Sequence, residues 1–206
     1  MPRIDLAVPF AEKDHVKLLG AYWDGKRKVW YVPDGADALA FWKWLPGTDG
    51  LDVRSSSYCI ARAPAPCWKC QQTTPVYGFV LPSGHETLES AEEDGLPDFW
   101  RRSEDPGMTM YVTELLPGVA ARIATFSRHY RDDFSASAES SYLMNHCEHC
   151  GIKQGDFRLH CKPPIAFFPM DARAASMIVL HAFYEPFGCS GGVSYGHPFI
   201  DDMRRA

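Results

Sequence analysis

The chain has 206 residues, of which 46% are hydrophobic and 13% aromatic, so it can build a substantial core and is not expected to be disordered. Its 21 basic and 26 acidic residues give a formal net charge of −5, which disfavours non-specific binding to phosphate backbones unless a local basic face exists. The chain has no apolar signal region and no apolar run of membrane-spanning length. We therefore expect a cytoplasmic protein without a membrane partner, in which the seven cysteines stay reduced.

Residues 1–46 are predicted to form a small, aromatic-rich module with the element order β-α-β-β-α. The expected elements are a strand at 4–8, a helix at 10–20, two strands at 22–23 and 29–32 around an Asp-Gly turn, and a helix at 36–45. The first helix should bury one apolar face, formed by Phe10, Val16, Leu18 and Leu19.

The residues of this module also resemble a known family. The matching positions are Val8-Pro9-Phe10, Glu12-Lys13-Asp14, Lys17, Leu19-Gly20-Ala21, Trp23-Asp24, Lys28 and Trp30-Tyr31-Val32-Pro33. Together they cover nearly all of residues 3–45, which is similar to the small bacterial module catalogued as domain of unknown function 5710. The resemblance implies a context of DNA primase-like and conjugation-associated proteins. It implies no reaction, because the family has no catalytic residues to carry over.

Residues 55–206 are predicted to form a second domain, so that the whole chain is α+β. The expected strands lie at 57–61, 75–81, 108–115, 157–160 and 165–168. Two principal helices are expected, at 117–130 and at 171–183, the second capped by Asp171. The glycine-rich tail at 188–198 is expected to be irregular.

Two C-x-x-C pairs, Cys67/Cys70 and Cys147/Cys150, dominate this second domain. Such a pair places two sulfurs on one side of a tight loop, and two facing pairs supply the four thiolates of a closed tetrahedral zinc site. The first pair also sits in a strand–turn–strand segment that resembles a zinc-ribbon hairpin. We therefore predict structural Zn²⁺ at these four cysteines. Gly151 suits the turn after the second pair, whereas Gln71 takes this place after the first pair.

Other side chains near the second pair could replace a thiolate. These alternatives are His146, His149, His160 and Cys161. A redox role for the C-x-x-C pairs is disfavoured, because Cys67 follows a proline-rich turn and does not open a helix. A zinc-dependent hydrolase would need an open coordination position and a carboxylate such as Glu148 as base. A four-thiolate site is closed, so we expect no enzymatic activity and rank the hydrolase last.

The N-terminal module carries a candidate nucleic-acid or partner contact. Its members are Lys26, Arg27 and Lys28 at the hairpin tip, with Trp23 and Trp30 beside them. Aromatic rings can stack on bases while basic side chains meet phosphates. The alternative is that a domain this small needs its large aromatic residues as core, and we favour that for most of its aromatic residues.

A strongly acidic segment runs from 84 to 105, and such a run is usually a solvated loop or helix face. Its alternative role is a face that docks on a basic protein, formed by Glu89, Glu92, Glu93 and Asp94. The leading hypothesis from the sequence is therefore a non-enzymatic zinc protein that acts through protein–protein contacts, as a neutralising or accessory module for a basic partner. The first alternative is a nucleic-acid-binding accessory protein of a mobile element.

Overall fold

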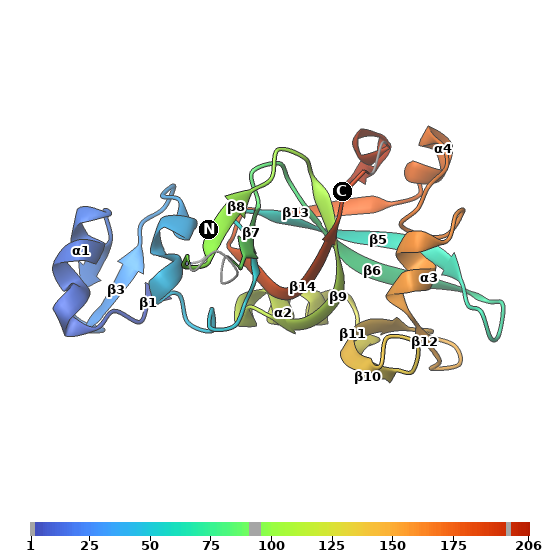
Figure 1. Ribbon diagram of the computed structural model, residues 1–206, viewed down its shortest axis with the longest axis horizontal. Coiled ribbons are helices and arrows are strands. Elements are labelled where there is room, and N and C mark those ends of the chain that lie inside the picture. The colour runs from blue at the N-terminus through green and yellow to red at the C-terminus, as the bar shows by residue number, and fades with distance from the viewer. Residues whose placement is uncertain (1–2, 91–95, 197–198) are drawn as a thin grey trace.

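The computed structural model describes residues 3–90, 96–196 and 199–206. It has mixed α and β structure in which strands predominate, arranged as a small three-stranded sheet, a nine-stranded sheet and a second three-stranded sheet. Figure 1 shows the N-terminal sheet at one end of the molecule and the second small sheet below the far half of the large sheet. None of the helices in these ranges combines the length and the apolar character that crossing a bilayer requires.

The N-terminal sheet has the antiparallel order β1-β3-β2. Its elements are β1 (Ile4–Leu6), η1 (Phe10–Glu12), α1 (Lys13–Leu18), β2 (Tyr22–Asp24), β3 (Val29–Val32) and the 3₁₀ helix η2 (Ala38–Trp44). The last of these elements, predicted as an α-helix, is a 3₁₀ helix. Glu12 links η1 to η2, because its carboxylate accepts hydrogen bonds from Trp44 Nε1 at 2.6 Å and from Lys43 Nζ at 2.8 Å.

The apolar face predicted for the first helix is largely wrong. Val16 is fully buried, but Phe10 is 82% exposed, Leu18 is 86% exposed, and Leu19 is also exposed. The physical reason is the shortness of α1, which has six residues and turns only one narrow stripe toward the sheet. The core of the module is instead completed by Phe41, Trp42 and Trp44 of η2.

The nine-stranded sheet has the order β15-β13-β5-β6-β9-β14-β4-β7-β8. Its strands are β4 (Val53–Ser55), β5 (Tyr58–Pro66), β6 (Thr73–Leu81), β7 (Glu86–Glu89), β8 (Phe99–Arg102), β9 (Gly107–Leu115), β13 (Val179–Phe183), β14 (Phe187–Ser194) and β15 (Arg204–Arg205). All neighbours pair antiparallel except β13 and β15. The sheet therefore joins strands from nearly every part of the second domain.

Alternate residues of β5 enter two different apolar cores. Tyr58 and Ile60 belong to a core that also contains α2 (Pro117–Phe126) and the residues of η2. Ala61, Ala63 and Ala65 belong to a second core, on the opposite face, with residues of α3 (Asp156–Cys161) and α4 (Ala172–Ala175). This period of two is the expected behaviour of a central strand covered on both faces. The short η4 (Ile200–Asp202) leads into β15.

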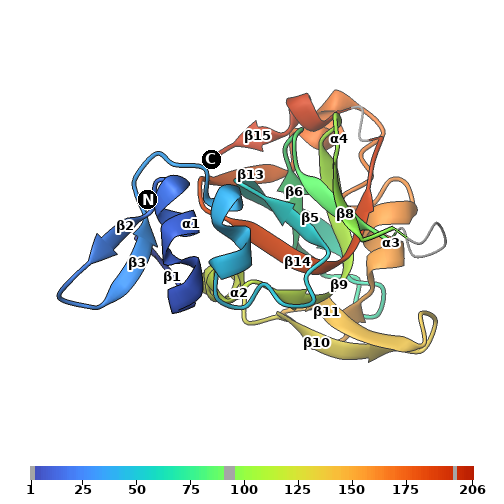
Figure 2. The same cartoon turned by 60° about the vertical axis from the view of Figure 1, so that its left-hand side comes forward.

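The second small sheet consists of β10 (Tyr130–Ser135), β11 (Ser140–His146) and β12 (Lys153–Gln154). Asn145 ties it to the large sheet, because its side-chain amide accepts from the Tyr77 N–H at 2.7 Å and donates to the Tyr77 carbonyl at 2.8 Å. The side chain thus replaces the backbone of a neighbouring strand. Figures 1 and 2 both show the β10–β11 hairpin running below the large sheet.

Several sequence-based elements need correction. Asp171 does cap a helix, accepting from the Ala174 N–H at 2.7 Å, but α4 ends at Ala175 and residues 179–183 form β13. The tail expected to be irregular contains β14, which lies between β9 and β4. Residues 157–160 belong to α3, and no strand covers 165–168. The acidic segment includes the hairpin of β7 and β8. Strands β13 and β14 pair with segments that are distant in sequence, β5 and β9, and local periodicity does not report such partners.

Trp42 joins the N-terminal module to the nine-stranded sheet. Its ring makes an edge contact with Trp100 of β8, with 5.9 Å between centroids. The guanidinium of Arg54 lies 5.7 Å from the Trp42 ring and 4.0 Å from the Trp100 ring. Gly188 of β14 leaves the room that the Trp42 ring occupies, since a Cβ there would lie 2.5 Å from Trp42 Cη2. The module and the sheet therefore share one apolar core.

Candidate metal centre and aromatic groove

The two C-x-x-C turns have the same backbone geometry. In the turn between β5 and β6, the Gln71 N–H donates to the Cys67 carbonyl at 3.0 Å and the Cys67 N–H donates to the Gln72 carbonyl at 3.0 Å. After β11, the Gly151 N–H donates to the Cys147 carbonyl at 2.9 Å, and the Cys147 N–H to the Ile152 carbonyl at 2.9 Å. The residue after each second cysteine is left-handed, with φ of 61° at Gln71 and 71° at Gly151. The first turn therefore adopts the same conformation without the glycine.

These matching turns bring together the four sulfurs of the two C-x-x-C pairs. The Sγ atoms of Cys67, Cys70, Cys147 and Cys150 all lie within 4.8 Å of one another. Cys67 and Cys150 are 3.7 Å apart, as are Cys70 and Cys147. A disulfide would need about 2.05 Å, whereas sulfurs about 2.3 Å from a tetrahedral Zn²⁺ are about 3.8 Å apart. The spacing therefore fits four ligands around one metal ion.

The electrostatics of the cluster also favour a cation. Burial raises the pKa of the Cys67 thiol, but hydrogen bonds from the backbone N–H groups of Cys70 and Lys69, joined by the neighbouring thiols, outweigh it and lower that pKa to about 6. A hydrogen bond from the Gln72 backbone lowers the pKa of Cys70, but burial and the neighbouring thiols outweigh it and raise that pKa to about 12. Four thiolates so close together repel one another, so a bound cation is needed to keep all four ionised.

Residues around the cluster hold its geometry. Gln154 of β12 donates from Nε2 to Cys67 Sγ at 3.3 Å. Trp68, inside the first pair, donates from Nε1 to the Lys153 carbonyl at 2.7 Å. His149, inside the second pair, lies with Nε2 3.0 Å from the Thr73 carbonyl. Each turn therefore contacts the strand that follows the other turn, which fixes the two pairs of sulfurs face to face.

The other candidate ligands have different positions. His146 is 1% exposed, and its Nε2 lies 2.9 Å from Asp133 Oδ2. The ring of His160 packs in a tilted arrangement against Phe167, with 4.9 Å between ring centroids, and Cys161 is exposed. Over the ranges that the structure describes, the group of ligand atoms within 4.8 Å of one another contains none of these residues, nor His149 or Glu148.

A second site is a groove of about 950 Å³ in the N-terminal module, between α1 and the β2–β3 hairpin. Its apolar and aromatic lining includes Leu6, Val8, Phe10, Ala21, Tyr22, Trp23, Val29 and Trp30, and its basic lining is Lys13, Lys17 and Lys28. None of its described lining residues is acidic. Trp23 is 51% exposed and lies 5.5 Å from Trp30 between ring centroids. We call this surface the aromatic groove.

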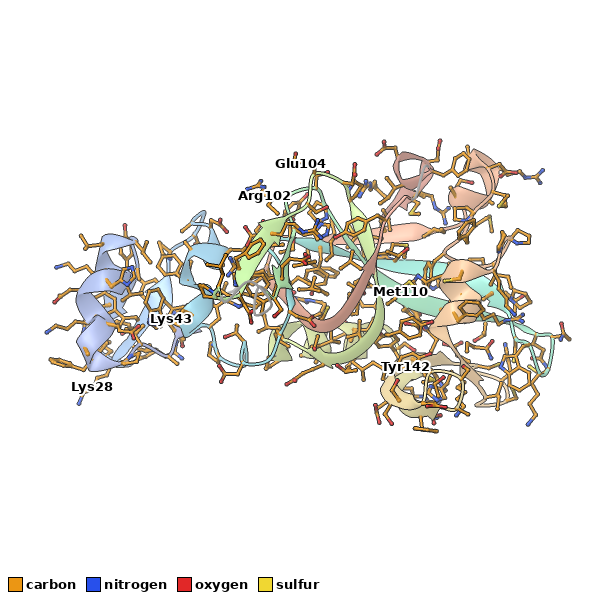
Figure 3. All side chains as sticks on the ribbon, viewed as in Figure 1. Lys28, Lys43, Arg102, Glu104, Met110 and Tyr142 are labelled. Atoms are coloured by element: carbon orange, nitrogen blue, oxygen red, sulfur yellow. The ribbon has the colours of Figure 1, made fainter. Side chains whose placement is uncertain are left out.

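Of the candidate basic residues of the hairpin tip, Lys26 and Arg27 contact acidic residues within the module, whereas Lys28 lines the groove. Arg27 is ion-paired with Asp5 at 2.8 Å, and its N–H and that of Lys26 both donate to Asp24 Oδ1 at 3.0 Å. Lys28 lines the aromatic groove, and Figure 3 shows it at the end of the module far from the large sheet. The structure thus places one of the three basic residues in the groove and engages Arg27 within the module.

Two functional candidates of the groove were missed from the sequence, Lys13 and Lys17. Lys13 Nζ lies 4.1 Å from the centroid of the exposed Phe10 ring, within the range of a cation–π contact. The signal for this face was the spacing of Phe10, Lys13 and Lys17, which are three and four residues apart and therefore neighbours on a helical surface. Assigning Phe10 to the core hid that signal.

The candidate acidic docking face is only partly described. Glu89 of β7 is ion-paired with Arg101 of β8 at 2.7 Å, across the hairpin that the two strands form. Glu92, Glu93 and Asp94 lie outside the described residues. The one described member of the face therefore has a partner within the chain.

Comparison with known proteins gives matches to short stretches of the chain. The chain is 49% identical over 51 residues to one protein described as "DNA primase TraC" from Escherichia coli, and 57% identical over 42 residues to a second protein of that description and organism. The alignments cover 24% and 20% of this chain but only 4% of each relative. No solved structure matches the chain. Residues 3–46 match the family model described as "Domain of unknown function (DUF5710)", in agreement with the resemblance of residues 3–45.

Proposed function

We propose that this protein is a non-enzymatic, zinc-stabilised accessory protein that binds single-stranded nucleic acid in the aromatic groove. The observation that carries the proposal is the composition of that groove, in which lysines and exposed aromatic rings line one concave surface without an acidic residue. Proteins that bind single strands without sequence preference combine stacking rings with basic side chains that follow the backbone. Trp23 and Trp30 offer the rings, and Lys13, Lys17 and Lys28 the charges.

The metal is proposed to be Zn²⁺ with a structural role. Four sulfur donors suit a soft or borderline cation, and a tetrahedral four-sulfur site is typical of zinc. Such a site leaves no coordination position for water or substrate, so we propose no reaction at it. The metal would instead tie the β5–β6 turn to the segment between β11 and β12. Thiolate ligands of this kind persist in a reducing compartment, which supports a cytosolic location.

The similarity of the module to part of proteins named DNA primases supports a nucleic-acid context, such as that of a mobile element. A local basic groove also resolves the objection raised by the net charge of −5, because binding depends on the charges near the contact. The protein-docking hypothesis has less support, because Glu89 is already paired with Arg101.

The test is the salt dependence of binding to a fluorescent single-stranded oligonucleotide of about 8 nucleotides, a length within the usual site size of one single-strand-binding domain. The variant replaces Lys13, Lys17 and Lys28 by Ala. The slope of log K against log salt is negative, and each lost phosphate contact reduces its magnitude by about 0.7. The magnitude of the slope should therefore be smaller by about 2 for the triple variant than for the unaltered protein. Its control replaces three exposed basic residues outside the N-terminal module, Lys69, Arg131 and Lys162, by Ala.

The control triple variant should bind with nearly the unaltered slope. Equal losses in the two triple variants would mean that the groove is not the contact. Absence of binding at low salt would refute the proposal. Capture of an acidic peptide in place of the oligonucleotide would assign the groove to a protein partner.

A further inference from the structure

A second basic surface lies on the nine-stranded sheet, far along the chain from the aromatic groove. Val179 of β13 pairs with Arg62 of β5 on one side and with Arg204 of β15 on the other. Residues directly opposite one another on neighbouring strands project from the same face of a sheet. The two arginines therefore flank Val179 on one face, with their Cα atoms about 10 Å apart across two strand spacings.

These residues line a cleft of about 360 Å³, together with Pro64, Thr73 and Met177. No acidic residue is among its described lining, and both arginines are exposed. No ion pair of either arginine occurs within the described part of the chain, where Arg3, Arg27, Arg54, Arg101 and Arg122 all have carboxylate partners. The cleft thus presents two uncompensated positive charges above an apolar floor.

The cleft lies next to the part of this sheet face that helix α2 covers. The last residue of α2, Phe126, packs against Tyr77 and against His181, two residues before Val179 along β13. Arg62 lies directly opposite Tyr77 in the register. Thr73, at the other end of the cleft, contacts through its carbonyl the side chain of His149, which lies in the turn between Cys147 and Cys150. The face is therefore bounded by the helix on one side and by the metal centre on the other.

We propose that this cleft is a second contact for nucleic acid, in which Arg62 and Arg204 bind phosphates of a strand whose other part lies in the aromatic groove. The inference rests on the proposed function and extends its site. Guanidinium groups are well suited to phosphate oxygens because they offer planar, paired donors. Two positive charges that lack a carboxylate partner among the described residues favour a phosphate backbone as the occupant. Short strands would fill only the groove, whereas long strands would reach both sites.

The test compares oligonucleotides of about 8 and about 30 nucleotides on the full chain. The variant is Arg62→Ala with Arg204→Ala. Its control is Arg131→Ala with Arg205→Ala, two exposed arginines, of which Arg205 is the neighbour of Arg204 on the same strand and faces the other side of the sheet. With the long strand, loss of two phosphate contacts should reduce the magnitude of the slope of log K against log salt by about 1.4 relative to the control. With the short strand, the two double variants should have equal slopes.

Equal slopes of the two double variants with the long strand would overturn the second contact and leave the aromatic groove intact. A loss that is the same with short and long strands would also overturn it, because the cleft would then not be a separate site. Failure of the unaltered protein to bind either strand would remove the proposed function and this extension together. Equal unfolding midpoints of the variants show that the fold is preserved.

Discussion

Asp156 makes the stability of this protein dependent on pH in a direction opposite to that of most carboxylates. It is 5% exposed, and its Oδ2 accepts the backbone N–H of Tyr111 at 2.7 Å. Burial raises the pKa of this carboxyl from 3.8 to about 7, against the effect of the Tyr111 hydrogen bond. In the unfolded chain the carboxyl ionises near pH 4, so the folded state binds the extra proton between about pH 4 and pH 7. The contribution of Asp156 to the free energy of unfolding therefore falls as the pH rises through this window and is constant above it.

Asp156→Asn removes this titration while keeping an oxygen that can accept the Tyr111 N–H. With a folded pKa of about 7, the contribution of Asp156 to the free energy of unfolding should fall by about 2.5 kcal/mol between pH 5 and pH 8. The free energy of unfolding of the variant, relative to that of the unaltered protein, should therefore be about 2.5 kcal/mol higher at pH 8 than at pH 5. Taking the difference at each pH cancels the titration of the cysteines and other groups.

The assay is urea unfolding followed by tryptophan fluorescence at pH 5 and at pH 8, with equal metal content in all samples. Asp105→Asn, at an exposed position, is the control and should give the same difference at both pH values. If the difference between Asp156→Asn and the unaltered protein is also the same at pH 5 and pH 8, the buried carboxyl does not carry the proton and the reasoning fails.

Two further predictions concern the metal and the contact between module and sheet. X-ray absorption at the zinc edge should find one Zn²⁺ with four sulfur neighbours, and Cys147→Ala should reduce the zinc retained; nitrogen or oxygen neighbours would contradict the assignment. Gly188→Ala should destabilise the fold by about 1–3 kcal/mol in urea unfolding, since its Cβ would meet Trp42 at 2.5 Å and Leu51 at 2.9 Å. Gly118→Ala, with no atom within 4 Å, is the control, and an equal loss there would show that crowding is not the cause.

The parts of the structure that could be predicted from the sequence have local signals. A C-x-x-C pair defines its own turn, so the clustering of the four cysteines followed from their spacing and is confirmed. The hairpin around Asp24 was likewise predictable, because its turn carries an Asp-Gly sequence. The order of elements in the N-terminal module followed from similar short-range patterns.

The parts that could not be predicted depend on contacts between distant segments. Residues 179–183 are apolar enough for either a helix or a strand, and only pairing with β5 decides between them. The glycines of β14 are typical of a loop in the sequence. In the structure, however, the Trp42 ring occupies the space where a side chain at position 188 would lie, so a glycine is required there. The aromatic groove was missed because the exposure of Phe10 depends on the shortness of α1.

The long separation of the two cysteine pairs has a consequence for the order of events during synthesis. Cys70 and its neighbour in the cluster, Cys147, are 77 residues apart, so at about 5–20 residues per second the first pair leaves the ribosome about 4–15 s before the second. During this interval the nascent chain offers only half of the ligand set. The central strands β5 and β6 also precede their outer neighbour β13 in the chain. Closure of the metal centre is therefore a late step, and it can take place only after most of the chain has emerged.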